Sequence, residues 1–179
     1  MRKIIIYLAI TVLTYSCAIY GLTNDYNKLD KKEKLRITKL SSFDNIEKGK
    51  IYELNAEILK TELIKYPKSI VYVFTNACTS SSCKPLSVYK DYADKNGYKI
   101  FFVMKGYGRV DETLEQNESL SLFSIDSDYY QTKYSYKYTR YFENELMGID
   151  KNTKHKEYLG SIFFFENGTF TKVYQELPK

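Results

Sequence analysis

The sequence predicts an α/β domain with a central mixed sheet flanked by helices. Two unbroken apolar segments, 69–75 and 99–104, enclose a segment of helical pattern, and this order is typical of a βαβ unit with parallel strands. Near the C-terminus, Asn167-Gly168 separates the apolar segment 161–165 from the alternating segment 169–174. An Asn-Gly pair between two such segments is the strongest short-range signal for an antiparallel hairpin.

The elements of this domain follow one another along the chain. Apolar residues at helical spacing predict a helix over 51–65, and Pro67 stands just beyond its end. After the first strand, Leu86, Tyr89 and Ala93 mark one face of the helix of the βαβ unit, which Asn96-Gly97 ends. Between the second strand and the hairpin, we expect a short helix over 110–117, a strand over 120–125 and a helix over 138–147 closed by Gly148.

The N-terminus predicts an export signal. Arg2 and Lys3 precede an apolar run over 4–13, and small and polar residues then lead to Cys17. This order is typical of a secretory signal, and the cysteine indicates a bacterial lipoprotein in which Cys17 is acylated. Ser16 fits the lipobox pattern, whereas Leu13 lies one position too far from the cysteine. We therefore expect a signal peptide over 1–16.

An uncleaved membrane anchor extending to about residue 24 is the alternative. Residues 4–24 carry no charge, and about 20 apolar residues are enough to span a bilayer. Both interpretations place the rest of the chain outside the cytoplasm, on the periplasmic side or cell surface of a bacterium, and hold it at the membrane. The polar, Lys-rich residues in 17–50 are then expected to form a tether and lead-in, and 51–179 the folded domain.

Composition excludes several classes of function. Lys and Arg number 27 against 22 Asp and Glu, and the lysines are dispersed among acids, so no nucleic-acid surface is expected. The chain has one histidine, His155, which excludes a multi-histidine metal site and argues against a His-based catalytic triad. His155 lies among lysines and is expected in a solvated loop. No metal or other cofactor is implied.

Two cysteines besides Cys17 carry the candidate chemistry. Cys78 and Cys83, spaced C-x4-C, stand between the first strand and the helix of the βαβ unit. An even number of cysteines in an oxidising compartment indicates pairing. A helix N-terminus would lower the pKa of the Cys78 thiol, and Cys83 on the first turns would lie close enough to resolve a mixed disulfide. The alternative is a structural disulfide, although so short a loop contributes only about 2 kcal/mol.

This layout resembles the thioredoxin-like superfamily. The resemblance covers roughly residues 69–175 and rests on a cysteine pair at the strand–helix junction, followed later by a hairpin of the form Phe-Phe-Phe-Glu-Asn-Gly. It implies that Cys78 is the nucleophile and Cys83 the resolving thiol in exchange with protein thiols or disulfides. The usual motif of the superfamily is C-x-x-C, so the C-x4-C spacing is a departure.

The C-x4-C spacing is similar to that of the bacterioferritin-comigratory type of peroxiredoxin. Thr75 and Thr79 match the threonines of that type three residues before and just after the reactive cysteine, whereas Asn76 replaces its usual proline. A peroxidase also needs an arginine near the thiolate, and Arg109 and Arg140 are the candidates.

A second departure concerns the start of the hairpin. Thioredoxin-like enzymes carry a cis-proline there, facing the cysteine pair, and this chain has Gly160-Ser161 instead. We expect thiol–disulfide exchange as the function. The missing proline favours the alternative of a non-catalytic lipoprotein that binds a partner on a disulfide-stapled thioredoxin-like scaffold, and peroxidase activity is the third possibility.

Overall fold

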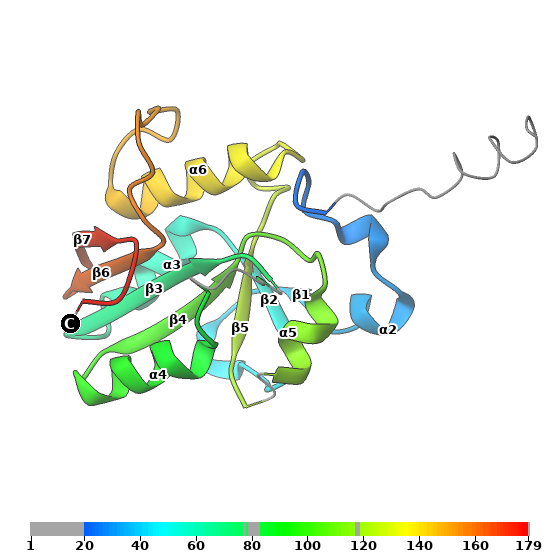
Figure 1. Ribbon diagram of the computed structural model, residues 1–179, viewed down its shortest axis with the longest axis horizontal. Coiled ribbons are helices and arrows are strands. Elements are labelled where there is room, and N and C mark those ends of the chain that lie inside the picture. The colour runs from blue at the N-terminus through cyan, green and yellow to red at the C-terminus, as the bar shows by residue number, and fades with distance from the viewer. Residues whose placement is uncertain (1–19, 77, 79–82, 117–118, 179) are drawn as a thin grey trace, which may run out of the picture.

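A computed structural model of the 179-residue chain describes residues 20–76, 78, 83–116 and 119–178. Its centre is a seven-stranded mixed sheet of order β1-β2-β5-β4-β3-β6-β7 (Figure 1). The strands from β1 to β3 along this order are mutually parallel, and β6 and β7 add an antiparallel hairpin next to β3. The strands are β1 (Ile37–Lys39), β2 (Ile51–Leu54), β3 (Lys68–Phe74), β4 (Lys99–Met104), β5 (Leu122–Ile125), β6 (Ile162–Glu166) and β7 (Thr169–Tyr174).

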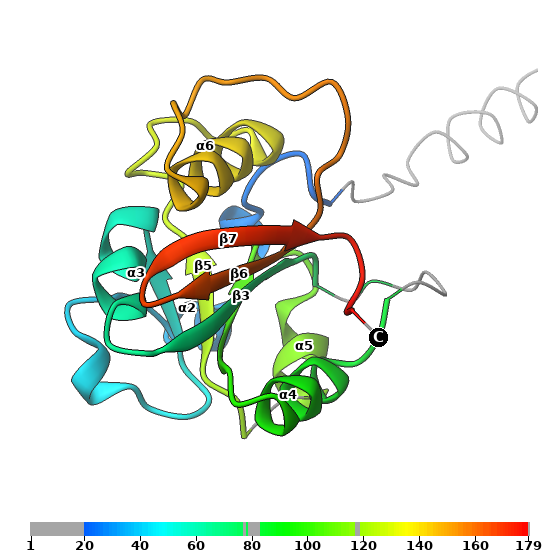
Figure 2. The same ribbon diagram turned by 90° about the vertical axis from the view of Figure 1, so that its left-hand side faces the viewer.

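Helices cover both faces of the sheet (Figures 1 and 2). Helices α3 and α6 pack on one face, where α6 buries Tyr138 and Phe142 against the sheet, and α4 and α5 pack on the other. The helices are α2 (Lys31–Lys34), α3 (Ala56–Leu63), α4 (Leu86–Lys95), α5 (Val110–Gln116) and α6 (Ser135–Met147), with short 3-10 turns η1 (Tyr26–Lys28) and η2 (Phe43–Asn45). The α/β class, the mixed sheet and its flanking helices are therefore confirmed.

The two patterns that predicted the fold class are both present. Strands β3 and β4 pair in parallel with α4 between them, and every residue of β3 from Ser69 to Phe74 is buried, as an unbroken apolar segment indicates. Strands β6 and β7 form the hairpin, with Asn167-Gly168 at its turn, and both turn residues have positive φ angles.

The predicted helix over 51–65 is wrong in its first part. Residues Ile51–Leu54 form β2, which pairs in parallel with β5, and Ile51 and Leu54 are buried between the flanking layers. The helix begins only after Asn55, whose side-chain oxygen accepts a hydrogen bond from the Ile58 N–H at 2.9 Å. Apolar residues at 51, 54 and 58 fit helical spacing as well as they fit a buried strand followed by a helix, so spacing alone could not separate the two.

The described part of the segment 17–50 belongs to the folded body. It supplies β1 to the edge of the sheet, and Leu29 and Leu40 are buried in the core. No helix in the described part of the chain is long and apolar enough to cross a bilayer. The predicted signal peptide over 1–16 and the predicted lipid-bearing Cys17 lie outside the described residues.

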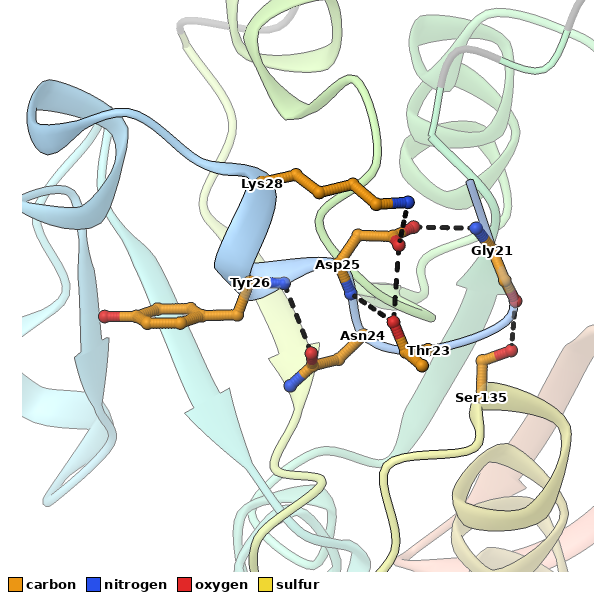
Figure 3. Close-up of polar contacts among 7 residues, drawn as sticks. All are labelled: Gly21, Thr23, Asn24, Asp25, Tyr26, Lys28 and Ser135. Carbon is orange, nitrogen blue, oxygen red and sulfur yellow. Dashed lines mark hydrogen bonds and ion pairs between the residues drawn. The ribbon is translucent and has the colours of Figure 1, made fainter. Parts of the chain in front are cut away.

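Asp25 organises the start of the described chain (Figure 3). It is 3% exposed and has a φ of 60°, and its carboxylate accepts a hydrogen bond from the Gly21 N–H at 2.7 Å and pairs with Lys28 Nζ at 2.8 Å. The Ser135 hydroxyl donates to the Gly21 carbonyl, which joins the segment to the start of α6. The Asn24 carbonyl also accepts from the Tyr107 N–H at 2.8 Å, so residues 20–28 are held against the rest of the protein.

Candidate functional site: the Cys78–Cys83 disulfide and its surroundings

Cys78 and Cys83 form a disulfide in the connection between β3 and α4, with their Cα atoms 6.0 Å apart. Cys78 is exposed and Cys83 is half-buried. The predicted placement of Cys83 on the first turns of the helix is wrong, because α4 begins at Leu86, after Pro85, and both cysteines precede it.

The disulfide borders a cavity of about 370 Å³, which we call the cysteine cavity. The carboxyl ends of the parallel strands supply one side of this cavity, through Thr75 after β3 and Lys105 after β4. Helix α5 contributes Glu112, and Ser161, the residue before β6, also lines the cavity. The structure therefore brings the two cysteines together with Thr75 and with Ser161 at the hairpin start, where the resemblance led us to look for a proline, whereas Thr79 lies outside the described residues.

The backbone explains why no proline stands at the hairpin start. Ser161 donates its N–H to the Tyr174 carbonyl at 3.0 Å, and its own carbonyl accepts from the Val73 N–H at 2.9 Å. A proline at 161 would remove that N–H, and Gly160 has a φ of 139°, which a proline ring cannot adopt. Any Cβ at 160 would also lie 2.3 Å from the Tyr174 oxygen. The backbone conformation at Gly160 and the hydrogen bonds of Ser161 therefore hold β6 between β3 and β7.

Asn76 likewise has a structural role where the peroxiredoxin pattern has proline. It is 8% exposed, and its side-chain amide donates to the Gly106 carbonyl at 2.7 Å, which ties the end of β3 to the loop after β4. The amide thus fixes the strand that leads into the cysteine connection.

Cations and aromatic rings surround the disulfide. Lys84 and Lys105 both line the cysteine cavity, and positive charge next to a thiol favours its thiolate. Tyr72 stacks on Tyr89 with ring centroids 4.0 Å apart below the cavity, and burial raises the pKa of the Tyr72 hydroxyl well above its ordinary value. Tyr72 is therefore neutral at physiological pH and serves as an apolar wall, not as a base.

The two candidate arginines do not line the cysteine cavity. Both Arg109 and Arg140 line a second cavity, which adjoins the first and shares Thr75, Lys105 and Tyr158 with it. The Arg109 side chain is already paired, because its Nε donates to Glu112 at 2.7 Å. The arginine contact that a peroxidase needs is thus not formed in this structure by either residue at the cavity that holds the disulfide.

The remaining predicted residue, His155, lies in an exposed loop after α6. One of its ring nitrogens is 2.8 Å from the side-chain oxygen of Asn144, a buried residue whose amide donates to three carbonyls of the same loop. His155 therefore helps to fix the loop, and it does not line the cysteine cavity.

Sequence reasoning missed Lys105, Glu112 and Tyr158 as neighbours of the disulfide. Lys105 could have been found, because it follows β4 just as Thr75 follows β3, and the carboxyl ends of adjacent parallel strands meet at one edge. Glu112 and Tyr158 have no such signal, since their positions depend on how α5 and a long loop pack.

Comparisons with protein-family models, curated proteins and solved structures found no match to this chain. The resemblance to the thioredoxin-like superfamily therefore stays a prediction, and its support comes from the position of the disulfide within the fold.

Proposed function

We propose that the protein is an exported, membrane-tethered, thioredoxin-like protein that carries out thiol–disulfide exchange through Cys78 and Cys83. The observation that carries this proposal is the position of an accessible disulfide at the carboxyl end of β3. The disulfide follows β3, the first strand of the βαβ unit. On its other side in the sheet, β3 pairs with β6 of the antiparallel hairpin. Ligands of open α/β sheets bind at that end of the parallel strands.

In the reduced protein, the Cys78 thiolate attacks a substrate disulfide, forms a mixed disulfide and releases one substrate sulfur as a thiolate. The Cys83 thiolate then attacks Cys78, re-forms the Cys78–Cys83 disulfide and releases the second substrate thiolate. Two electrons pass from the cysteine pair to the substrate, and the same steps in reverse oxidise a dithiol. The greater exposure of Cys78 supports its role as the attacking residue, and Lys84 and Lys105 contribute positive charge to the same cavity.

A partner-binding scaffold is the second candidate. Ser161 and Gly160 at the hairpin start are used to hold β6, so the proline with which thioredoxin-like enzymes face the cysteine pair has no place here. Glu112, an acid at the cavity, is paired with Arg109. In this alternative, the disulfide holds the loop, and the surface around it binds a protein without exchange.

The reduction potential of the cysteine pair tests the proposal. The full chain in detergent is equilibrated in glutathione buffers, and the thiols are counted by mass in the peptide that contains both Cys78 and Cys83. A potential between about −120 and −270 mV is that of working oxidoreductases and supports exchange. A potential below about −300 mV is that of a structural disulfide, and the partner-binding function would replace the proposal.

A further inference from the structure

The buried polar atoms without a hydrogen-bond partner are concentrated in one place. In the described part of the chain, five buried side-chain N or O atoms have no such partner, and one of them is Ser69 Oγ in β3. The other four belong to residues that line the second cavity, and they are Asn76 Oδ1, Thr139 Oγ1, Arg140 Nε and Glu143 Oε1. Leaving a buried polar atom unpaired costs about 1–3 kcal/mol, so a cluster of four indicates a site built for a polar ligand.

This second cavity, which we call the α6 cavity, has a volume of about 440 Å³. Thr139, Arg140 and Glu143 line it from α6, and their spacing of three and four places them along one side of the helix. The opposite wall comes from Asn76 and Lys105, at the ends of β3 and β4. The volume lies within the range of about 300–1,000 Å³ that is usual for small-molecule sites.

The N-terminal segment forms a further wall of the α6 cavity, and Figure 3 shows how its polar groups are engaged. The Asp25 carboxylate already accepts a hydrogen bond from the Gly21 N–H and forms an ion pair with Lys28, so it has few free acceptor positions for a ligand. Arg109, at the rim, is paired with Glu112. These two charged groups therefore contribute to the walls and not to recognition.

The ionisable groups left over in the α6 cavity are Lys105, Arg140 and Glu143. None of the three takes part in an ion pair within 4.0 Å in the described part of the chain. Two cations against one acid favour an anionic group in the ligand. Asn76 Oδ1 and Glu143 Oε1 are acceptors without donors, so the ligand must also bring an N–H or O–H group.

The rim of the α6 cavity is aromatic. Tyr20, Tyr136 and Tyr158 line it and remain 48%, 69% and 57% exposed. Three accessible tyrosines beside one cavity supply flat apolar surface that is available to a ligand. The polar cluster thus lies next to a surface suited to an apolar or aromatic group.

We propose that the α6 cavity binds a small carboxylic acid that carries a hydroxyl or amino group beside the carboxylate, on an apolar or aromatic body. The carboxylate accepts hydrogen bonds from the terminal guanidinium nitrogens of Arg140 and from Lys105 Nζ. The neighbouring hydroxyl or amino group donates to the Glu143 carboxyl, and the body packs on the tyrosines of the rim. Binding of this ligand does not require the cysteines.

Four probes that share a phenyl body test the proposed chemistry. L-Phenyllactate and L-phenylalanine have the carboxylate and the adjacent donor, 3-phenylpropionate lacks the donor, and phenethylamine lacks the carboxylate. Binding to the full chain in detergent is measured by calorimetry, with detergent alone as the blank. We expect the first two probes to bind at least fivefold more tightly than the last two, and the order of the first two tells whether a hydroxyl or an amino group is preferred.

Four variants, one of them a control outside the cavity, test whether binding occurs in the α6 cavity. We expect Arg140→Gln to weaken the binding of the better probe at least tenfold, whereas Arg36→Gln, which changes an exposed arginine outside this cavity, leaves it unchanged. Thr139→Val keeps the side-chain shape and serves as the second test if Arg140→Gln does not fold. The double variant Cys78→Ser/Cys83→Ser should bind as the wild type does, which separates this inference from the proposed thiol chemistry.

Either of two results would overturn the proposal. If none of the four probes binds, the unpaired atoms are satisfied by ordered water alone. If 3-phenylpropionate or phenethylamine binds as tightly as the other two, the cavity recognises the ring and not the polar groups.

Discussion

Ser161 donates its backbone N–H to the carbonyl oxygen of Tyr174 at 3.0 Å while it lines the cavity that holds the Cys78–Cys83 disulfide. The residue that faces the cysteines is thus also a link between β6 and β7. Changes at this position act on the hairpin and on the candidate site together.

The variant Ser161→Pro should destabilise the protein by about 1–3 kcal/mol, because it removes the N–H and leaves the Tyr174 carbonyl without its donor. Urea unfolding followed by circular dichroism measures this loss. Ser161→Ala keeps the N–H and should stay within about 0.5 kcal/mol of the wild type. Equal stability of the two variants would mean that this hydrogen bond does not hold the hairpin.

Gly160→Ala should cost more than 2 kcal/mol, because the new Cβ would meet the Tyr174 carbonyl oxygen at 2.3 Å, and backbone cannot move aside cheaply. Gly97→Ala is the matched control, since Gly97 also has a positive φ but has no atom within 4 Å of the added Cβ. It should lose only about 1 kcal/mol, from backbone strain. Midpoints of thermal unfolding compare the two, and similar midpoints would contradict the contact.

Cys83→Ser should trap a mixed disulfide between Cys78 and a substrate thiol, because the resolving thiol is gone. Cys78→Ser should form no such adduct and should lose insulin reduction. Non-reducing gels and mass spectrometry of the adduct provide the measurement. Both variants should also lose about 2 kcal/mol of stability, since they lack the disulfide, and an unchanged exchange activity in Cys78→Ser would refute the proposed function.

Glu143 makes stability depend on pH. Burial raises its pKa from the ordinary 4.5 to about 7, and nearby Lys105 offsets only part of that. Since the folded-state pKa is the higher one, the folded protein holds the proton more tightly, and this contribution to stability is complete below pH 4.5 and is lost as the pH rises through 7.

Glu143→Gln should therefore match the wild type near pH 4.5 and be more stable by about 2–3 kcal/mol near pH 8. Urea unfolding at the two pH values provides the measurement. Glu157→Gln, which changes an exposed acid in a loop, should show no such pH-dependent gain. A gain for Glu143→Gln that is the same at both pH values would mean that burial of the charge is not its cause.

The sequence analysis succeeded where a local pattern had one structural meaning. The unbroken apolar segments that became β3 and β4, and Asn167-Gly168 between β6 and β7, could be read without knowledge of the rest of the chain. The segment Ile51–Leu54 could not, because its pairing with β5 joins residues about 70 positions apart. By composition, residues 20–50 resemble a polar tether. The apolar residues that pack into the core, such as Leu29 and Leu40, are scattered along this segment and form no pattern.

For the candidate site, the sequence placed the cysteine pair at the correct strand–helix junction but placed the helix start too early. Pro85 has an extended ψ of 147° and is the N-cap residue, so α4 begins at Leu86. The α6 cavity had no sequence signal, because Arg140, Asn76 and Tyr20 meet only through the packing of α6, the sheet and the N-terminal segment.

The hydrogen bonds that hold residues 20–28 to the start of α6 and to Tyr107 limit how far the protein can reach. If Cys17 carries the lipid, three peptide steps separate it from Tyr20, and a fully extended chain of that length spans only about 10 Å. Such a protein sits directly on the bilayer, with the rim of the α6 cavity beside the headgroups. Soluble molecules still reach such a protein from the bulk, whereas a partner that is itself held in the membrane meets it by a search in two dimensions.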